Sequence, residues 1–182
     1  MGAASIKKLA VLFPGRNYST DSPLFYYAVR VLEEKGYDIL KVNYGDLPSE
    51  SAEDAMSAVK EQALGAVKEA VGCGYSEYLF LSKSIGTIVA GYVEELLAIP
   101  VRHVFLTPLP GTLRYMKPGR CLVIAGGRDY VLKKDRLKDY CTSNQIALWQ
   151  ADNGGHSLNV KGNPVESVRI LGDVVRLLEE FV

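Results

Sequence analysis

Tyr78-Leu79-Phe80-Leu81-Ser82-Lys83-Ser84-Ile85-Gly86 is the stretch of sequence that decides the fold. It opens with large apolar residues, which predict a buried strand over 78–81. Small and polar residues follow at once, and apolar residues then recur with helical spacing over 85–97. A buried strand that turns directly into a helix is typical of a parallel sheet covered by helices.

The same alternation of short apolar runs and helical patterns extends over the rest of the chain. Further strands are expected at 9–13, 39–42, 101–106, 121–125 and 146–149, and further helices at 24–34, 51–71, 132–140 and from Pro164 onward. In the last helix, Val168, Leu171, Val175 and Leu178 are expected to face the core. We therefore predict a single α/β domain over 1–182, a three-layer α/β/α sandwich with a mostly parallel six-stranded sheet. Only the Pro/Gly-rich loop Thr107–Arg120 separates two of the strands, so no lid is expected.

The composition excludes several classes of partner. The chain carries 21 basic and 21 acidic residues, without a basic stripe that could neutralise a phosphate backbone. No apolar run approaches the ~20 residues of a membrane span. The first residues lack a signal-peptide core, and Ile6 stands where a myristoylation signal needs Ser or Thr. We expect no nucleic-acid or membrane partner and a cytoplasmic location.

The cysteine pattern offers no metal site. Cys73, Cys121 and Cys141 are widely spaced and have no histidine cluster beside them. They are predicted to be reduced structural thiols, because cytosolic disulfides are rare. Neither zinc nor another cofactor is expected.

Residues that could carry chemistry follow three of the predicted strands. Ser84 comes just after 78–81, Asp129 follows 121–125, and His156 lies in a glycine-rich turn after 146–149. The carboxyl ends of parallel strands meet at one edge of the sheet, so these side chains can converge there. Their order along the chain is Ser, Asp, His.

That order, on alternating strands and helices, resembles the α/β-hydrolase fold family, particularly the small, cap-less dienelactone hydrolase and carboxylesterase-like group. The family's Gly-x-Ser-x-Gly elbow appears here as Ser82-Lys83-Ser84-Ile85-Gly86, with Ser82 in place of the first glycine. Small residues flank the nucleophile because the turn between strand and helix is strained. The resemblance implies that Ser84 is the catalytic nucleophile.

Two histidines compete for the role of catalytic base. His103 lies inside a predicted strand, where a packing or hydrogen-bonding role is favoured. His156 occupies the turn just before the last helix, where the family has its catalytic histidine. A serine nucleophile needs a base that titrates near neutrality, so His156 is the candidate base.

The resemblance also implies an acid and an oxyanion hole. The family mostly takes its acid from the loop that holds Asp129, although this residue could instead stabilise a turn or cap a helix. Asp152 is the rival acid, but it is close enough to His156 in sequence to stabilise that turn. The implied oxyanion hole consists of the Ile85 amide and the loop with Gly15 and Arg16, for which a simple turn is the alternative reading.

Two other features, a lysine and a group of tyrosines, have structural explanations as well as functional ones. Lys83 could act as a second base, but at this turn it is expected to point outward. Tyr18, Tyr26 and Tyr27 could line a pocket or fasten the first helix to the sheet.

These residues favour a hydrolase of the carboxylesterase or thioesterase type. It would cleave a small-molecule ester or thioester through a Ser-His-Asp triad and an acyl-enzyme. One alternative is a non-catalytic ligand-binding or interaction protein with the same fold. Another is a flavodoxin-like module whose residues 15–20 hold the phosphate of a nucleotide or flavin. Whether the chain forms a homodimer stays open.

Overall fold

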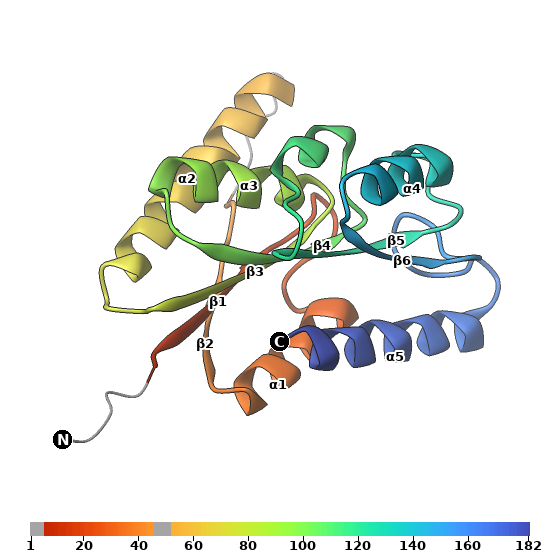
Figure 1. Ribbon diagram of the computed structural model, residues 1–182, viewed down its shortest axis with the longest axis horizontal. Coiled ribbons are helices and arrows are strands. Elements are labelled where there is room, and N and C mark those ends of the chain that lie inside the picture. Colours follow the sequence, from red (N-terminus) through yellow and green to blue (C-terminus); the bar gives the residue numbers. More distant parts are fainter. Residues whose placement is uncertain (1–5, 46–51) are drawn as a thin grey trace.

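The computed structural model describes residues 6–45 and 52–182. The first five residues, the loop with Asp46, Pro48 and Ser49, and the expected helix start at Ser51 lie outside the described residues. Six strands form one sheet in the order β2-β1-β3-β4-β5-β6, and every pair is parallel (Figure 1). The strands are β1 (Lys8–Phe13), β2 (Tyr37–Lys41), β3 (Glu77–Lys83), β4 (Val101–Leu106), β5 (Cys121–Gly126) and β6 (Ala147–Ala151).

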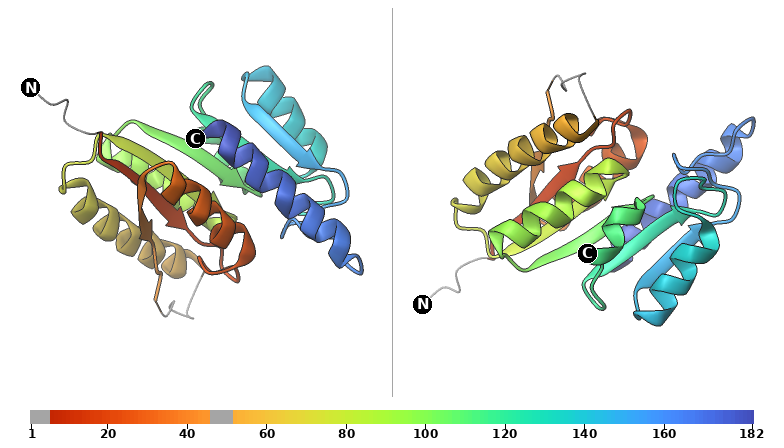
Figure 2. Two further views of the ribbon diagram at one scale, coloured as in Figure 1. Left: turned by 90° about the horizontal axis from the view of Figure 1, so that it is seen from below. Right: turned by 90° about the horizontal axis from the view of Figure 1, so that it is seen from above.

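Helices cover both faces of this sheet, as the predicted three-layer sandwich requires (Figure 2). Two of them, α1 and α5, pack side by side on one face, and the other three α-helices lie on the opposite face. The helices are α1 (Pro23–Glu34), α2 (Ala52–Val71), α3 (Ile85–Leu97), α4 (Lys134–Ser143) and α5 (Pro164–Phe181), with a short 3-10 helix, η1 (Pro110–Tyr115).

The position of β3 inside the sheet explains why its sequence is almost continuously apolar. Its side chains alternate between the two faces of the sheet. Leu79 and Leu81 pack into the cluster under α1 and α5, whereas Tyr78 and Phe80 pack into the cluster under α2 and α3. Both faces are covered, so the strand has no solvent-facing side that would call for polar residues.

The predicted core face of α5 is wrong at one position. Val168 is 67% exposed, whereas Leu178 is buried as predicted. The other buried residues of this helix are Ile170 and Val174. Leu171 and Val175 are half-buried and pack against the hydrophobic cluster that contains the buried residues of α5. The buried face is therefore rotated relative to the prediction.

Other differences concern the ends of elements and the loop after β4. The expected strand 39–42 begins earlier, at Tyr37, and the expected helix 132–140 is shifted to Lys134–Ser143. The loop Thr107–Arg120 contains η1 but no inserted lid, as predicted. Within residues 6–45 and 52–182, no helix combines the length and apolar character that a membrane span requires.

The strand order fixes where a ligand can bind. From β1 the chain moves to β2 on one side of the sheet, and from β3 it moves to β4 on the other side. The loops that follow β1 and β3 therefore diverge and leave a crevice at the carboxyl edge of the sheet. Ser84, between β3 and α3, lies at this switch point.

Candidate active site

The backbone at Ser84 has the conformation of a strained turn. Its φ is 52° and its ψ is −119°, a region that non-glycine residues seldom adopt and that costs roughly 1–3 kcal/mol. The Ser84 N–H donates to the carbonyl of Leu106 at 3.0 Å, and its own carbonyl accepts from the N–H of Thr87 at 3.0 Å. Strand β4 and the first turn of α3 thus hold the residue in this conformation.

Gly86 lets the turn lie directly against the end of β1. A Cβ atom at this position would lie 2.4 Å from the carbonyl oxygen of Phe13 and 2.5 Å from that of Pro14. Real Cβ atoms essentially never come so close to backbone oxygens. The last glycine of the elbow motif is therefore required here by a close backbone approach.

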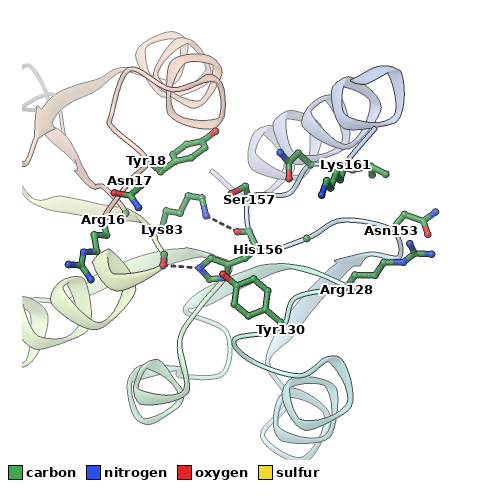
Figure 3. A pocket seen from close by; sticks show the side chains of 15 residues that line it. Arg16, Asn17, Tyr18, Lys83, Arg128, Tyr130, Asn153, His156, Ser157 and Lys161 are labelled. Carbon is green, nitrogen blue, oxygen red and sulfur yellow. Dashed lines mark hydrogen bonds between the residues drawn. The ribbon is translucent and has the colours of Figure 1, made fainter. Parts of the chain in front are cut away.

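The three predicted catalytic side chains form one hydrogen-bonded chain. Ser84 Oγ lies 2.9 Å from His156 Nε2 (Figure 3). His156 Nδ1 lies 2.8 Å from Asp129 Oδ2. The Ser84 and His156 side chains both line the cavity, whereas Asp129 is buried. In this arrangement the imidazole can accept the serine proton on Nε2 while Nδ1–H donates to the carboxylate.

Asp129 is held in place by the turn after β5. Its Oδ1 accepts from the N–H of Val131 at 2.8 Å, so the carboxylate stabilises its own turn with one oxygen and contacts His156 with the other. It does not cap α4, whose N-cap is Lys133. The rival Asp152 side chain is exposed and pairs with Lys134, at 3.6 Å.

Glycines bring the turn after β5 against the loop that presents His156. A Cβ atom on Gly126 would lie 2.2 Å from the carbonyl oxygen of Gly154, and one on Gly127 would lie 2.6 Å from that of Asp152. The Arg128 N–H donates to the Gly154 carbonyl at 2.9 Å. This backbone contact fixes the acid and the histidine relative to each other.

The expected oxyanion-hole residues lie around the same turn. Gly15 lies beside the nucleophile, because a Cβ atom on it would be in van der Waals contact with Ser84 Cβ, at 3.5 Å. Its N–H donates to the Tyr18 carbonyl, so Gly15 supplies close approach and not a donor. The N–H groups of Arg16 and Ile85 could serve as donors. Among the described residues, neither takes part in a backbone hydrogen bond of a turn, loop or helix cap. As the first residue of α3, Ile85 also has no intrahelical acceptor.

Lys83 does not point outward, and this prediction is wrong. The residue is only 1% exposed, and its Nζ donates to Thr107 Oγ1 at 2.8 Å and to the His156 carbonyl at 2.9 Å (Figure 3). Its ammonium group also lies 5.0 Å from the centre of the Tyr18 ring. Burial lowers the pKa of Lys83 to about 8, and the Asp129 carboxylate partly offsets this effect. Lys83 therefore fastens the backbone of His156 to the elbow.

His103 has the structural role expected from its strand. It is buried, and its Nε2 lies 3.1 Å from Glu94 Oε2. Glu94 also accepts from Lys117 at 3.0 Å. Burial lowers the pKa of His103, although the hydrogen bond to Glu94 opposes the effect.

One of the three tyrosines lines the cavity, and two do not. Tyr18 borders the cavity, and its OH accepts from the N–H of Leu24 at 3.1 Å, which ties the loop to the start of α1. Tyr26 and Tyr27 are about half exposed on α1. The cavity has a volume of about 650 Å³, and the Ser84 and His156 side chains border it together with Tyr130, which is 83% exposed.

The phosphate-cradle alternative gains no support from the loop after β1. Gly15 and Tyr18 exchange backbone hydrogen bonds with each other, and the Asp21 N–H donates to Ser19 Oγ. The Gly15 and Tyr18 N–H groups are therefore used within the loop and are not free to bind a phosphate.

The fold matches solved structures of α/β hydrolases. A lid-less α/β serine hydrolase from Xanthomonas campestris matches with a TM-score of 0.73 and 18% sequence identity, over 98% of this chain and 82% of the other. Est1E from Butyrivibrio proteoclasticus matches with a TM-score of 0.71 and 12% identity, over 98% and 88% of the two chains. An α/β serine hydrolase homologue from Coxiella burnetii gives 0.66 and 15%, over 96% and 87%.

Searches with the sequence against models of protein families and against curated proteins find no match. The structural matches lie below 20% identity and still span nearly the whole chain. The protein therefore has the α/β-hydrolase fold in its lid-less form, as the sequence predicted.

Proposed function

We propose that this protein is a serine hydrolase that cleaves a small carboxylic ester or thioester through an acyl-enzyme on Ser84. The observation that carries the proposal is the unbroken hydrogen-bonded chain from Ser84 Oγ through His156 to Asp129, with its serine end in a cavity. A buried carboxylate, an imidazole and a strained serine in this order form the machinery of nucleophilic acyl transfer.

The first half of the reaction acylates Ser84. His156 Nε2 takes the proton from Ser84 Oγ as this oxygen attacks the carbonyl carbon of the substrate. The Arg16 and Ile85 amides donate to the developing oxyanion. When the tetrahedral intermediate collapses, the imidazolium gives its proton to the leaving alcohol or thiol. Asp129 stabilises the imidazolium throughout and keeps Nδ1–H oriented.

The second half of the reaction releases the acid. Water enters the open cavity and gives a proton to His156 Nε2 as its oxygen attacks the acyl carbon. Collapse of the second intermediate breaks the bond to Ser84 Oγ, which recovers its proton from the imidazolium. The lid-less, open cavity suits a small substrate. The reaction cycle uses no cofactor.

A pre-steady-state assay with p-nitrophenyl acetate tests the acyl-enzyme. We expect a burst of p-nitrophenol whose amplitude approaches one equivalent per protein molecule, because acylation by an activated ester commonly outpaces deacylation. The burst is followed at 400 nm by stopped flow, in parallel with steady-state turnover. Hydrolysis no faster than in buffer alone would overturn the proposal.

Asp129→Asn is expected to lower kcat by about 10³–10⁴-fold, because an amide in this place favours the wrong imidazole tautomer. The amide oxygen can still accept from the Val131 N–H, so the thermal midpoint of unfolding should change little. Steady-state hydrolysis of p-nitrophenyl acetate measures the effect. A kcat within tenfold of the wild type would remove Asp129 from the mechanism.

Lys83→Met is expected to lower kcat by about 10-fold or more, because small displacements of a catalytic group are costly. The variant loses the donor that holds the His156 carbonyl. Steady-state hydrolysis of p-nitrophenyl acetate measures the loss.

The matched control for this variant is Lys138→Met, at an exposed position on α4. The control should keep the wild-type kcat. If Lys83→Met also keeps the wild-type kcat, the side chain does not position the histidine.

A further inference from the structure

The cavity beside Ser84 has a lining of one charge sign. Arg16, Lys83, Arg128 and Lys161 border it, and no carboxylate is among its described lining residues. The whole chain has equal numbers of basic and acidic residues. The excess of positive charge is therefore a local property of the cavity and does not follow from the composition.

Carboxylates close to the cavity do not neutralise this charge. Asp129 is buried and contacts His156, and it offsets the charge of Lys83 only in part. Asp152 pairs with Lys134 at 3.6 Å, and Asp21 pairs with Lys41 at 2.6 Å. Within the part of the chain that the structure describes, the four basic side chains of the cavity form no ion pair with a carboxylate.

Lys83 is the innermost of these four cations. Its Nζ donates to two neutral acceptors, Thr107 Oγ1 and the His156 carbonyl. A buried ammonium group is normally paired with a carboxylate, because the loss of hydration costs free energy. Its pKa of about 8 still leaves the group mostly protonated at neutral pH. An anion in the cavity would add to the partial counter-charge that the Asp129 carboxylate supplies.

We infer that the substrate is an anionic ester or thioester, whose negative charge is attracted by the basic residues that border the cavity, Arg16, Lys83, Arg128 and Lys161. This inference rests on the proposed function and narrows it to a class of substrate. Cationic clefts raise the local concentration of anions and accelerate their capture, and salt weakens both effects. The cavity volume of about 650 Å³ accommodates a small carboxylate-bearing ester.

Monomethyl succinate and dimethyl succinate test the charge preference, because they share a scissile methyl ester and differ in one negative charge. Dimethyl succinate has two equivalent esters, so its kcat/KM is expressed per ester group. On that basis we expect kcat/KM of the anionic monoester to be higher by about 10-fold or more at low salt. At 0.5 M NaCl the preference should shrink to about threefold or less. Equal values, or a preference for the neutral diester, would overturn the inference.

Two double variants show which basic residues cause the preference for the anionic ester. Arg128→Gln/Lys161→Gln should lower the ratio of the two kcat/KM values by about 5-fold or more. The control Arg136→Gln/Lys138→Gln removes the same charge from exposed positions on α4 that do not border the cavity. It should leave the ratio and the activity unchanged. An equal loss in both variants would attribute the effect to net charge and contradict a cavity subsite.

Calorimetric titration of Ser84→Ala protein with each ester separates this inference from the proposed function. Tighter binding of the monoester supports the anion subsite even if no ester is hydrolysed, in which case the hydrolase proposal alone fails. Hydrolysis of the neutral diester without preferential binding or turnover of the monoester keeps the hydrolase and refutes the subsite.

Discussion

Ser84→Ala is expected to lower kcat for p-nitrophenyl acetate by about 10⁴-fold or more, because no other group can form the acyl-enzyme. The substitution removes only the oxygen that lies 2.9 Å from His156 Nε2. Alanine has no special tolerance for the positive φ of this turn, so the backbone strain should persist in the variant. Steady-state hydrolysis and the amplitude of the p-nitrophenol burst both measure the loss.

Ser82→Ala is the matched control two residues away. Ser82 lies within β3 and is fully buried, and its Oγ donates to the Val104 carbonyl at 3.4 Å, a long hydrogen bond. This variant should stay within about threefold of the wild-type kcat, since surrounding contacts are unchanged. If Ser82→Ala loses as much activity as Ser84→Ala, the nucleophile is misassigned.

Gly86→Ala is expected to destabilise the protein by about 3 kcal/mol or more, the upper range for overpacking in a well-packed core. The added methyl group would meet two backbone carbonyls of the segment Phe13–Pro14 at 2.4 and 2.5 Å. Neither oxygen belongs to a side chain that could rotate away. For a chain of this size, the thermal midpoint should fall by roughly 6–12 °C.

Gly172→Ala is expected to have the opposite effect on the stability of the protein. This glycine is exposed within α5, and a Cβ atom added to it would have nothing within 4 Å. Alanine at a helical site should stabilise the protein by about 0.5–1 kcal/mol. Calorimetric unfolding of both variants checks the pair. Similar midpoints for the two variants would show that β1 and α3 do not approach as closely as described.

The alternation of buried strands and amphipathic helices is what made the fold predictable. In a parallel sheet covered on both faces, the strands must be apolar over several residues and the helices must carry one apolar stripe. Strand β4 and helix α3 have the predicted ends, because Pro100 and the elbow mark them sharply. The ends of β1 at Phe13 and of α1 at Glu34 also match, because Pro14 and Gly36 follow them closely. Several other ends move by a few residues.

The inward position of Lys83 could not be predicted from its neighbours in sequence. Lysine is normally exposed, so the local pattern indicates a solvent-facing side chain. The groups that accept its hydrogen bonds lie 24 and 73 residues further along the chain. Only the folded sheet brings the end of β4 and the histidine loop to the elbow. Long-range partners of this kind leave no local signal.

The rotation of α5 has a different cause. The apolar residues of α5 occupy neighbouring faces of the helix, so their spacing is compatible with more than one buried face. Val168 satisfies the periodic spacing but is exposed, whereas Ile170 is buried against the sheet. The choice between rows depends on packing against α1, which the spacing alone does not specify.

Labelling with a fluorophosphonate, followed by mass spectrometry of the digested protein, tests the central claim most directly. The reagent bonds covalently to a serine that an adjacent base activates. We predict one adduct per molecule, on the peptide that contains Ser84, and no adduct in Ser84→Ala. An adduct on another residue, or equal labelling of the wild type and Ser84→Ala, would contradict the assignment of Ser84 as the nucleophile.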